Sequence, residues 1–133
     1  MFQPKRLERW DAGSAPGFQV LGVAFTRDAL ARFPAHICPP DAHVTTAEFA
    51  DFVRAPLVWT AERRIIVSPL VHPAFDACDL AAVMCEKGFD GQYLAICNAV
   101  ADPEVIRADI ARIAPNLSFD IVNLDGTRRL RAV

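Results

Sequence analysis

Apolar and polar residues alternate along this chain in the pattern of a parallel β-sheet with crossover helices. Short apolar runs rich in β-branched residues are separated by amphipathic segments of about twelve residues. The runs predict five strands, most of them buried on both faces, at residues 18–25, 35–38, 65–70, 93–98 and 119–124. Right-handed crossovers then predict an α/β fold: a three-layer, doubly wound, five-stranded parallel sheet in the order 2-1-3-4-5.

Capping residues and prolines predict helices between these strands, over residues 27–33, 47–54, 76–87 and 102–114. Three of these helices are expected to begin at single capping residues, Thr26, Asp76 and Asp102. Thr45 or Thr46 is expected to cap the second helix, with Glu48 placed as in a capping box. The segment 57–62 fits either a brief strand or a loop that covers a sheet edge.

The 133 residues are enough for one domain that spans the whole chain, 1–133. Residues 1–16 contain proline, glycine and a basic pair, so they are expected to form a peripheral leader. Residues 125–133 are a C-terminal extension that begins with the hairpin signal Asp125-Gly126. Residues 127–133 could then return as a sixth, antiparallel strand at the edge of the sheet.

Composition and charge argue against several classes of function. Apolar residues make up 53% of the chain, and 14 basic against 16 acidic side chains leave a net charge of −2. This balance favours neither a nucleic-acid partner nor a membrane partner. No apolar run is long enough to cross a bilayer, and the charged N-terminus does not fit a secretory signal. We therefore expect a cytoplasmic protein.

The cysteine pattern argues against a metal or redox centre. The four cysteines are not arranged in a Cys-x-x-Cys pair, which favours buried thiols that act as small hydrophobes: Cys38, Cys78, Cys85 and Cys97. His36, Cys38 and His43 lie close together in sequence, but they lack the fourth ligand and the additional cysteines of a structural zinc site. We expect neither a metal nor a cofactor.

The carboxyl ends of the predicted strands are where a ligand would bind in such a sheet. The first strand ends in Ala24-Phe25 without the glycines that let a backbone approach phosphate. The third strand is followed by His72, close in sequence to Ser68. Ser68 precedes a proline and does not fit a nucleophile elbow, so a Ser-His hydrolase is not expected.

Residues 69–77, PLVHPAFDA, are similar to the segment that follows the third strand of bacterial response-regulator receiver domains, which have the flavodoxin-like sheet order. Pro73 matches the receiver proline, and Asp76 matches the acid that opens the next helix. The end of that helix, Lys87-Gly88-Phe89, also resembles the receiver pattern. The resemblance covers residues 18–124 and is weaker in the first half.

The chain departs from receivers where their chemistry takes place. Ala24 and Phe25 stand at the positions of the acidic pair that holds magnesium, and Pro69 stands at the phospho-acceptor position. Cys97 replaces the hydroxyl residue, and Asn123 replaces the lysine. Phosphoryl transfer needs a carboxylate nucleophile, a metal held by acids, and a cation. The resemblance therefore implies a pseudo-receiver that is neither an enzyme nor phosphorylated.

These patterns predict a non-catalytic regulatory module of bacterial signalling that acts by protein–protein contact, with a homodimer as a further expectation. Eight residues are expected to form a degenerate pocket or an interaction surface: Ala24, Phe25, Pro69, His72, Phe75, Cys97, Asn123 and Trp59. The alternative is a small-molecule sensor that binds a nucleotide or flavin at the carboxyl ends of the strands, where Phe25 and Phe75 could stack on the ligand. An enzyme is not expected, because Asp28, Asp76 and Asp102 are explained by helix starts.

Overall fold

The computed structural model describes residues 17–57, 59, 63–98 and 102–124. Its centre is a five-stranded sheet in which all neighbouring strands are parallel, in the order β2-β1-β3-β6-β7. The strands are β1 (Phe18–Val23), β2 (His43–Ala47), β3 (Arg63–Pro69), β6 (Gln92–Cys97) and β7 (Ser118–Asn123). Counted along the chain, this is the predicted order 2-1-3-4-5, so the doubly wound parallel sheet is confirmed.

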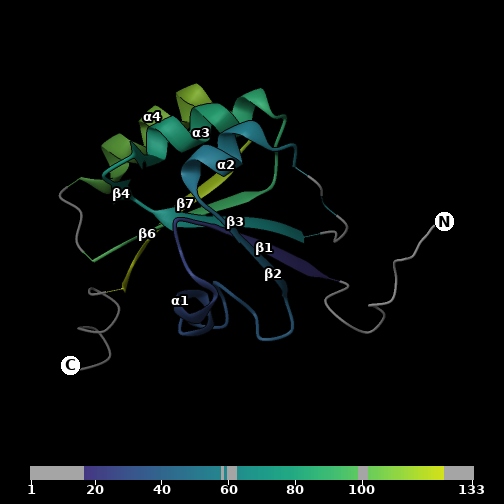
Figure 1. Cartoon of the computed structure of the whole chain (residues 1–133). Coiled ribbons are helices and arrows are strands. Elements are labelled where there is room, and N and C mark those ends of the chain that lie inside the picture. The colour runs from purple at the N-terminus through teal and green to yellow at the C-terminus, as the bar shows by residue number, and fades with distance from the viewer. Residues whose placement is uncertain (1–16, 58, 60–62, 99–101, 125–133) are drawn as a thin grey trace, which may run out of the picture.

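Helices cover both faces of the sheet and give the fold three layers. The helices are α1 (Arg27–Ala31), α2 (Phe49–Arg54), α3 (Ala77–Glu86) and α4 (Pro103–Ile113). Helix α1 lies on one face, and α2, α3 and α4 lie on the other (Figure 1). A small antiparallel hairpin of β4 (Val71–His72) and β5 (Phe75–Asp76) connects β3 to α3. The predicted leader and the predicted sixth strand lie outside the described residues.

Each face of the sheet has its own hydrophobic core, because successive side chains of a strand point to opposite faces. Ile66 of β3 packs with Leu80 and Met84 of α3 on the face of the three helices. Its neighbours Ile65 and Val67 belong to the core on the α1 face. The central strands are thus apolar on both sides, which explains their near-continuous apolar sequence.

The predicted second strand at residues 35–38 is wrong, because β2 begins further along the chain at His43. Residues 35–38 form a turn in which the N–H groups of Ile37 and Cys38 donate to the carbonyl of Pro34 at 2.9 and 3.1 Å. Ile37 is fully buried although it belongs to no strand. The prolines on either side favour this turn over pairing as a strand. The apolar residues of the segment are present because Ile37 is buried, and they led to the prediction of a strand.

The predicted cap of the second helix is also wrong. Thr45 and Thr46 lie within β2, and α2 begins after Glu48, whose side chain makes no capping hydrogen bond. A capping box is present instead at α3, where the Asp79 N–H donates to the Asp76 carboxylate at 2.9 Å and the Asp76 N–H donates to the Asp79 carboxylate at 3.1 Å. The predicted helix start at Asp76 is therefore confirmed, with a second acidic residue completing the box.

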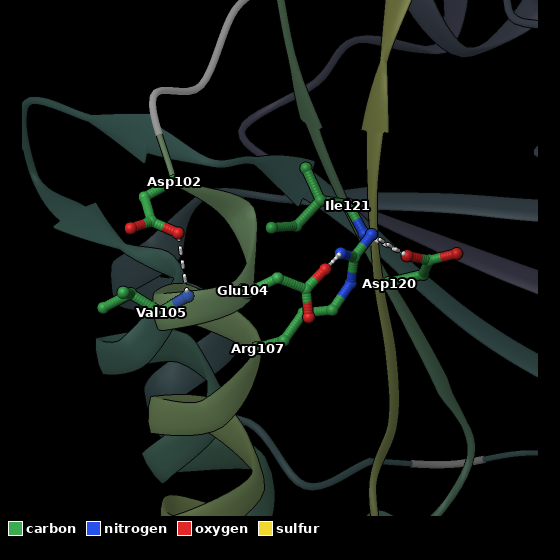
Figure 2. A network of polar contacts seen from close by, with 6 residues as sticks. All are labelled: Asp102, Glu104, Val105, Arg107, Asp120 and Ile121. Atoms are coloured by element: carbon green, nitrogen blue, oxygen red, sulfur yellow. Dashed lines mark hydrogen bonds and ion pairs between the residues drawn. The ribbon is translucent and has the colours of Figure 1, made fainter.

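The other two predicted caps are confirmed. The side chain of Thr26 accepts a hydrogen bond from the Ala29 N–H at 3.1 Å, and that of Asp102 accepts one from the Val105 N–H at 3.4 Å (Figure 2). Of the ambiguous segment 57–62, the structure describes Leu57 and Trp59, and both lie outside the strands.

Candidate functional site

A cavity of about 850 Å³ lies at the carboxyl ends of β1 and β2, where α1 and α2 begin. Residues 24–27, 46–51 and the hairpin residues His72 and Ala74 line it. After β1 the chain continues to α1 on one face of the sheet, and after β3 it continues to α3 on the other face (Figure 1). The cavity therefore lies beside the point where the strand order reverses. Ligands of doubly wound proteins bind at this position. The cavity is therefore the candidate functional site.

The floor of the cavity contains a residue in an unusual conformation. Ala24 has φ = 66°, the left-handed region that residues with a Cβ atom rarely adopt. Its N–H donates to the carbonyl of Ala47 at 2.9 Å, which joins the ends of β1 and β2. The chain thereby turns directly from β1 into the Thr26 cap of α1. Such backbone strain is common at functional sites.

We expect Ala24→Gly to raise the free energy of unfolding by about 0.5–1 kcal/mol, because glycine relieves the left-handed strain. Ala47→Gly is the matched control in the neighbouring strand, and it should lower the same quantity by about as much through loss of backbone entropy. Urea unfolding followed by tryptophan fluorescence measures both. If Ala24→Gly were as destabilising as the control, the left-handed backbone would not be strained.

One wall of the cavity is formed by the rings of Phe49 and His72, and the buried ring of Phe75 lies behind them. The His72 and Phe75 rings stack at 5.0 Å between centroids, and the Phe75 and Phe49 rings stack at 4.8 Å. Phe75 is only 4% exposed, so it supports the wall and is not accessible for stacking on a ligand. His72 is held further by its Nδ1, which accepts a hydrogen bond from the Ala74 N–H at 3.1 Å. In the neutral ring the proton then resides on Nε2.

The opposite wall comes from the turn between β1 and α1. Phe25 is half-buried, and its ring meets that of Phe33 edge to face at 5.2 Å. Arg27, Thr46 and Glu48 line the cavity with exposed side chains of mixed charge. The lining thus combines aromatic surface with hydroxyl, cationic and anionic groups, which suits recognition of a partner or ligand with both apolar and polar parts.

A buried pair of hydroxyl groups lies at the end of β3, next to Pro69, the residue that the resemblance to receivers placed at the phospho-acceptor position. Pro69 ends β3, and the preceding Ser68 is fully buried. The Ser68 hydroxyl donates to the Pro69 carbonyl at 2.9 Å and lies 2.6 Å from the Tyr93 hydroxyl, which must then act as the donor to Ser68. Burial raises the pKa of Tyr93, although the Ser68 hydrogen bond opposes the shift. With no exposure, Ser68 is not a nucleophile for a ligand in the cavity.

The other predicted site residues lie away from the cavity. Cys97 ends β6, and its register partner on β7 is Asn123. Trp59 precedes β3 at the opposite end of the sheet, where its ring lies 5.3 Å from that of Phe89. Of the eight predicted residues, three line the cavity and one supports it: Ala24, Phe25 and His72, with Phe75 behind.

Sequence reasoning missed the lining residues contributed by the start of α2, because that helix was predicted to begin too early. Phe49 would have been recognisable as the first apolar residue after Glu48, had β2 been assigned correctly. Thr46 was passed over because it was interpreted only as a helix cap. Arg27 belongs to the segment of residues 26–28, which the sequence did indicate as part of an interaction face.

Three of the four cysteine thiols are partly buried, and Cys85 is exposed. All four cysteines are free, and burial raises the pKa of Cys38, Cys78 and Cys97. Asp76 adds to the shift at Cys78 by Coulombic repulsion of the thiolate. In the part of the chain that the structure describes, no three His, Cys, Asp or Glu side chains come together as a metal site.

The fold and the cavity define a doubly wound α/β protein of flavodoxin-like arrangement, with its candidate site at the switch in strand order. Comparison of the sequence with family models, with curated proteins and with solved structures gives no match. Among the described residues, no helix has the length and apolar character needed to cross a membrane.

Proposed function

We propose that this chain is a receiver-like, non-catalytic regulatory module of the bacterial cytoplasm that acts by protein–protein contact. The main support is the β4–β5 hairpin beside the cavity. Val71 is 74% exposed, while the stacking of Phe75 on Phe49 holds the hairpin against α2. An apolar residue on a fixed hairpin can bind a partner with little loss of conformational entropy. The mixed lining of the cavity would complement the polar part of that partner.

Val71→Glu is expected to abolish partner binding, since a charge would be buried at the contact. Val105→Glu is the matched control: Val105 is 54% exposed, and it lies on α4 instead of the hairpin. Chemical crosslinking in cells of the source organism, followed by mass spectrometry, compares the two variants with the unmodified chain. Crosslinked species that are lost in the first variant and retained in the second support the proposal. Equal patterns in all three proteins contradict it.

The proposed module works without phosphorylation. Neither Ala24 nor Phe25 has a side-chain carboxylate to hold magnesium, and the Pro69 side chain has no nucleophile. We expect the intact mass to stay unchanged after incubation with a small-molecule phosphodonor and Mg²⁺. A gain of one phosphoryl group at a side chain of the carboxyl-end face would contradict this part of the proposal.

A second candidate function is a small-molecule sensor, which the size of the cavity favours. About 850 Å³ is within the range of pockets for drug-sized ligands, and the rings of Phe25, Phe49 and His72 provide stacking surface. Native mass spectrometry of the purified chain, with a denatured control, separates the two candidates. A bound mass that disappears on denaturation supports the sensor, and that mass identifies the ligand class. A chain without bound mass supports the interaction module.

A further inference from the structure

The sheet has two edge strands that differ in how they are protected against pairing with another chain. In the described part of the structure, β2 pairs only with β1, and β7 pairs only with β6. β7 carries a charge in its middle: the Asp120 carboxylate accepts from the Arg107 guanidinium of α4 at 2.8 Å (Figure 2). Charged residues within an edge strand are a common defence against edge-to-edge association.

β2 has none of these defences. Its sequence, HVTTA, contains three β-branched residues and no proline, lysine, arginine or acidic residue. None of its side chains is fully buried, and those of His43 and Thr46 are exposed. A neutral β-branched strand at an open edge is a template for pairing with a further strand.

The backbone of β2 presents its open side in a defined register. The Ala47 carbonyl accepts from the Ala24 N–H at 2.9 Å, so Ala47 faces β1. The direction of the backbone groups alternates along a strand. Val44 and Thr46 therefore direct their N–H and C=O groups toward the open edge. These two residues flank Thr45 symmetrically.

We propose that β2 is a homodimerisation edge, which pairs antiparallel with β2 of a second copy about a two-fold axis at Thr45. In this register Val44 of each copy exchanges both backbone hydrogen bonds with Thr46 of the other, so all outward groups of the two residues are satisfied. A shift of this pairing register by two residues would leave Val44 or Thr46 unpaired, or would extend the pairing into the start of α2. The strand contains no lysine, arginine, aspartate or glutamate, so no pair of such charges opposes the meeting of two copies there.

A second feature of this edge favours a second copy as the occupant. A mainly apolar cavity of about 600 Å³ borders β2 on the α1 face; Val44, Phe33 and Pro40 are in its lining, together with the charged residues Arg27 and Asp28. In the proposed register Thr46 of the second copy lies opposite Val44 on this face, and its methyl group would cover the rim of the cavity. Association would thus bury apolar surface in addition to forming backbone hydrogen bonds. The inference concerns this edge alone and is independent of the partner proposed above.

Sedimentation equilibrium of the full chain from micromolar to millimolar concentration tests the dimer. We expect the unmodified chain to dimerise reversibly, and Thr46→Lys to raise the dissociation constant at least about tenfold by adding an edge charge. Ser118→Lys places the same charge on β7, where Ser118 is also exposed, and should leave the constant unchanged. A chain that stays monomeric at millimolar concentration, or equal effects of both lysines, would overturn the proposal.

Cysteine crosslinking tests the register. Thr45 of each copy forms a non-hydrogen-bonded pair, in which Cα atoms are about 4.5 Å apart, close enough for a disulfide. In a Cys85→Ser background, which removes the exposed native thiol, Thr45→Cys should form a covalent dimer under mild oxidation. Thr46→Cys should not, because Thr46 residues of the two copies are offset along the strands by two residues. Crosslinking through residue 46 without crosslinking through residue 45 would overturn the proposed axis.

Discussion

Replacing Gly91 with alanine is expected to lower the free energy of unfolding by about 3 kcal/mol, a large part of the stability of a small domain. A Cβ atom at this position would lie 2.6 Å from the backbone oxygen of Arg64 and 2.6 Å from a ring carbon of Phe89. The backbone oxygen belongs to β3 and cannot move without disturbing the sheet. The Gly91 carbonyl also accepts from the Ser118 N–H at 3.0 Å, so a shift would reach β7 as well.

Gly88→Ala is the matched control for this prediction. Gly88 has φ = 75°, so alanine there is strained, but a Cβ atom would meet no neighbour within 4 Å. The expected loss is about 1 kcal/mol. Urea unfolding of the three proteins, followed by circular dichroism, gives both differences. Equal losses of unfolding free energy in the two variants would contradict the prediction. The close contact of Gly91 with Arg64 and Phe89 would then add no cost to the alanine substitution.

The central strands and most helix starts were predictable because their signals are local. The apolar runs at residues 65–70 and 93–98 follow from burial on both faces, which requires apolar side chains at consecutive positions. Thr26, Asp76 and Asp102 were predictable because a cap needs a side-chain oxygen within three residues of the N–H that it satisfies.

The first half of the chain was harder to predict because its second strand, β2, has few apolar residues: its sequence is HVTTA. The side chains of β2 are only partly covered, so its sequence lacks the apolar density of a central strand. Ile37, by contrast, is fully buried in a turn and gives a strand-like signal where no strand exists. Thr45 and Glu48 have the spacing of a capping box, yet β-branched Thr45 and Thr46 extend the strand instead. Two local preferences competed, and pairing with β1 decided between them.

The candidate site depends on contacts that no local pattern encodes. The wall of the cavity requires Phe49 to meet Phe75, two rings that lie on different elements and far apart in sequence. The buried pair of Ser68 and Tyr93 joins residues 25 positions apart. Such pairs depend on the order of the strands and on their register together. When the predicted start of α2 is wrong by a few residues, Phe49 is no longer recognised as a partner of Phe75. This is why Ala24, Phe25 and His72 could be predicted while the start of α2 could not.

The stability of the fold is expected to fall steeply above about pH 10 because of Tyr93. Burial raises the pKa of Tyr93 above its ordinary value of 10.0, since the tyrosinate anion would lose its hydration in the core. Between the ordinary and the raised pKa, the unfolded chain releases this proton and the native chain keeps it. The native state then binds more protons than the unfolded state, so the free energy of unfolding falls by about 1.4 kcal/mol per pH unit from this group. Below pH 10 both states are protonated, and the contribution of Tyr93 is constant.

Tyr93 can be measured without interference, because it is the only tyrosine of the chain. We expect the ultraviolet absorbance of tyrosinate to appear near pH 10 in urea, but in the native protein only together with unfolding. Tyr93→Phe should remove this part of the pH slope and cost about 1 kcal/mol at neutral pH, since Ser68 keeps its bond to the Pro69 carbonyl. Ser68→Ala should cost more, about 2 kcal/mol, because it leaves the buried Tyr93 hydroxyl without its acceptor. Titration of the folded protein near pH 10, with its circular dichroism unchanged, would contradict the buried hydroxyl pair.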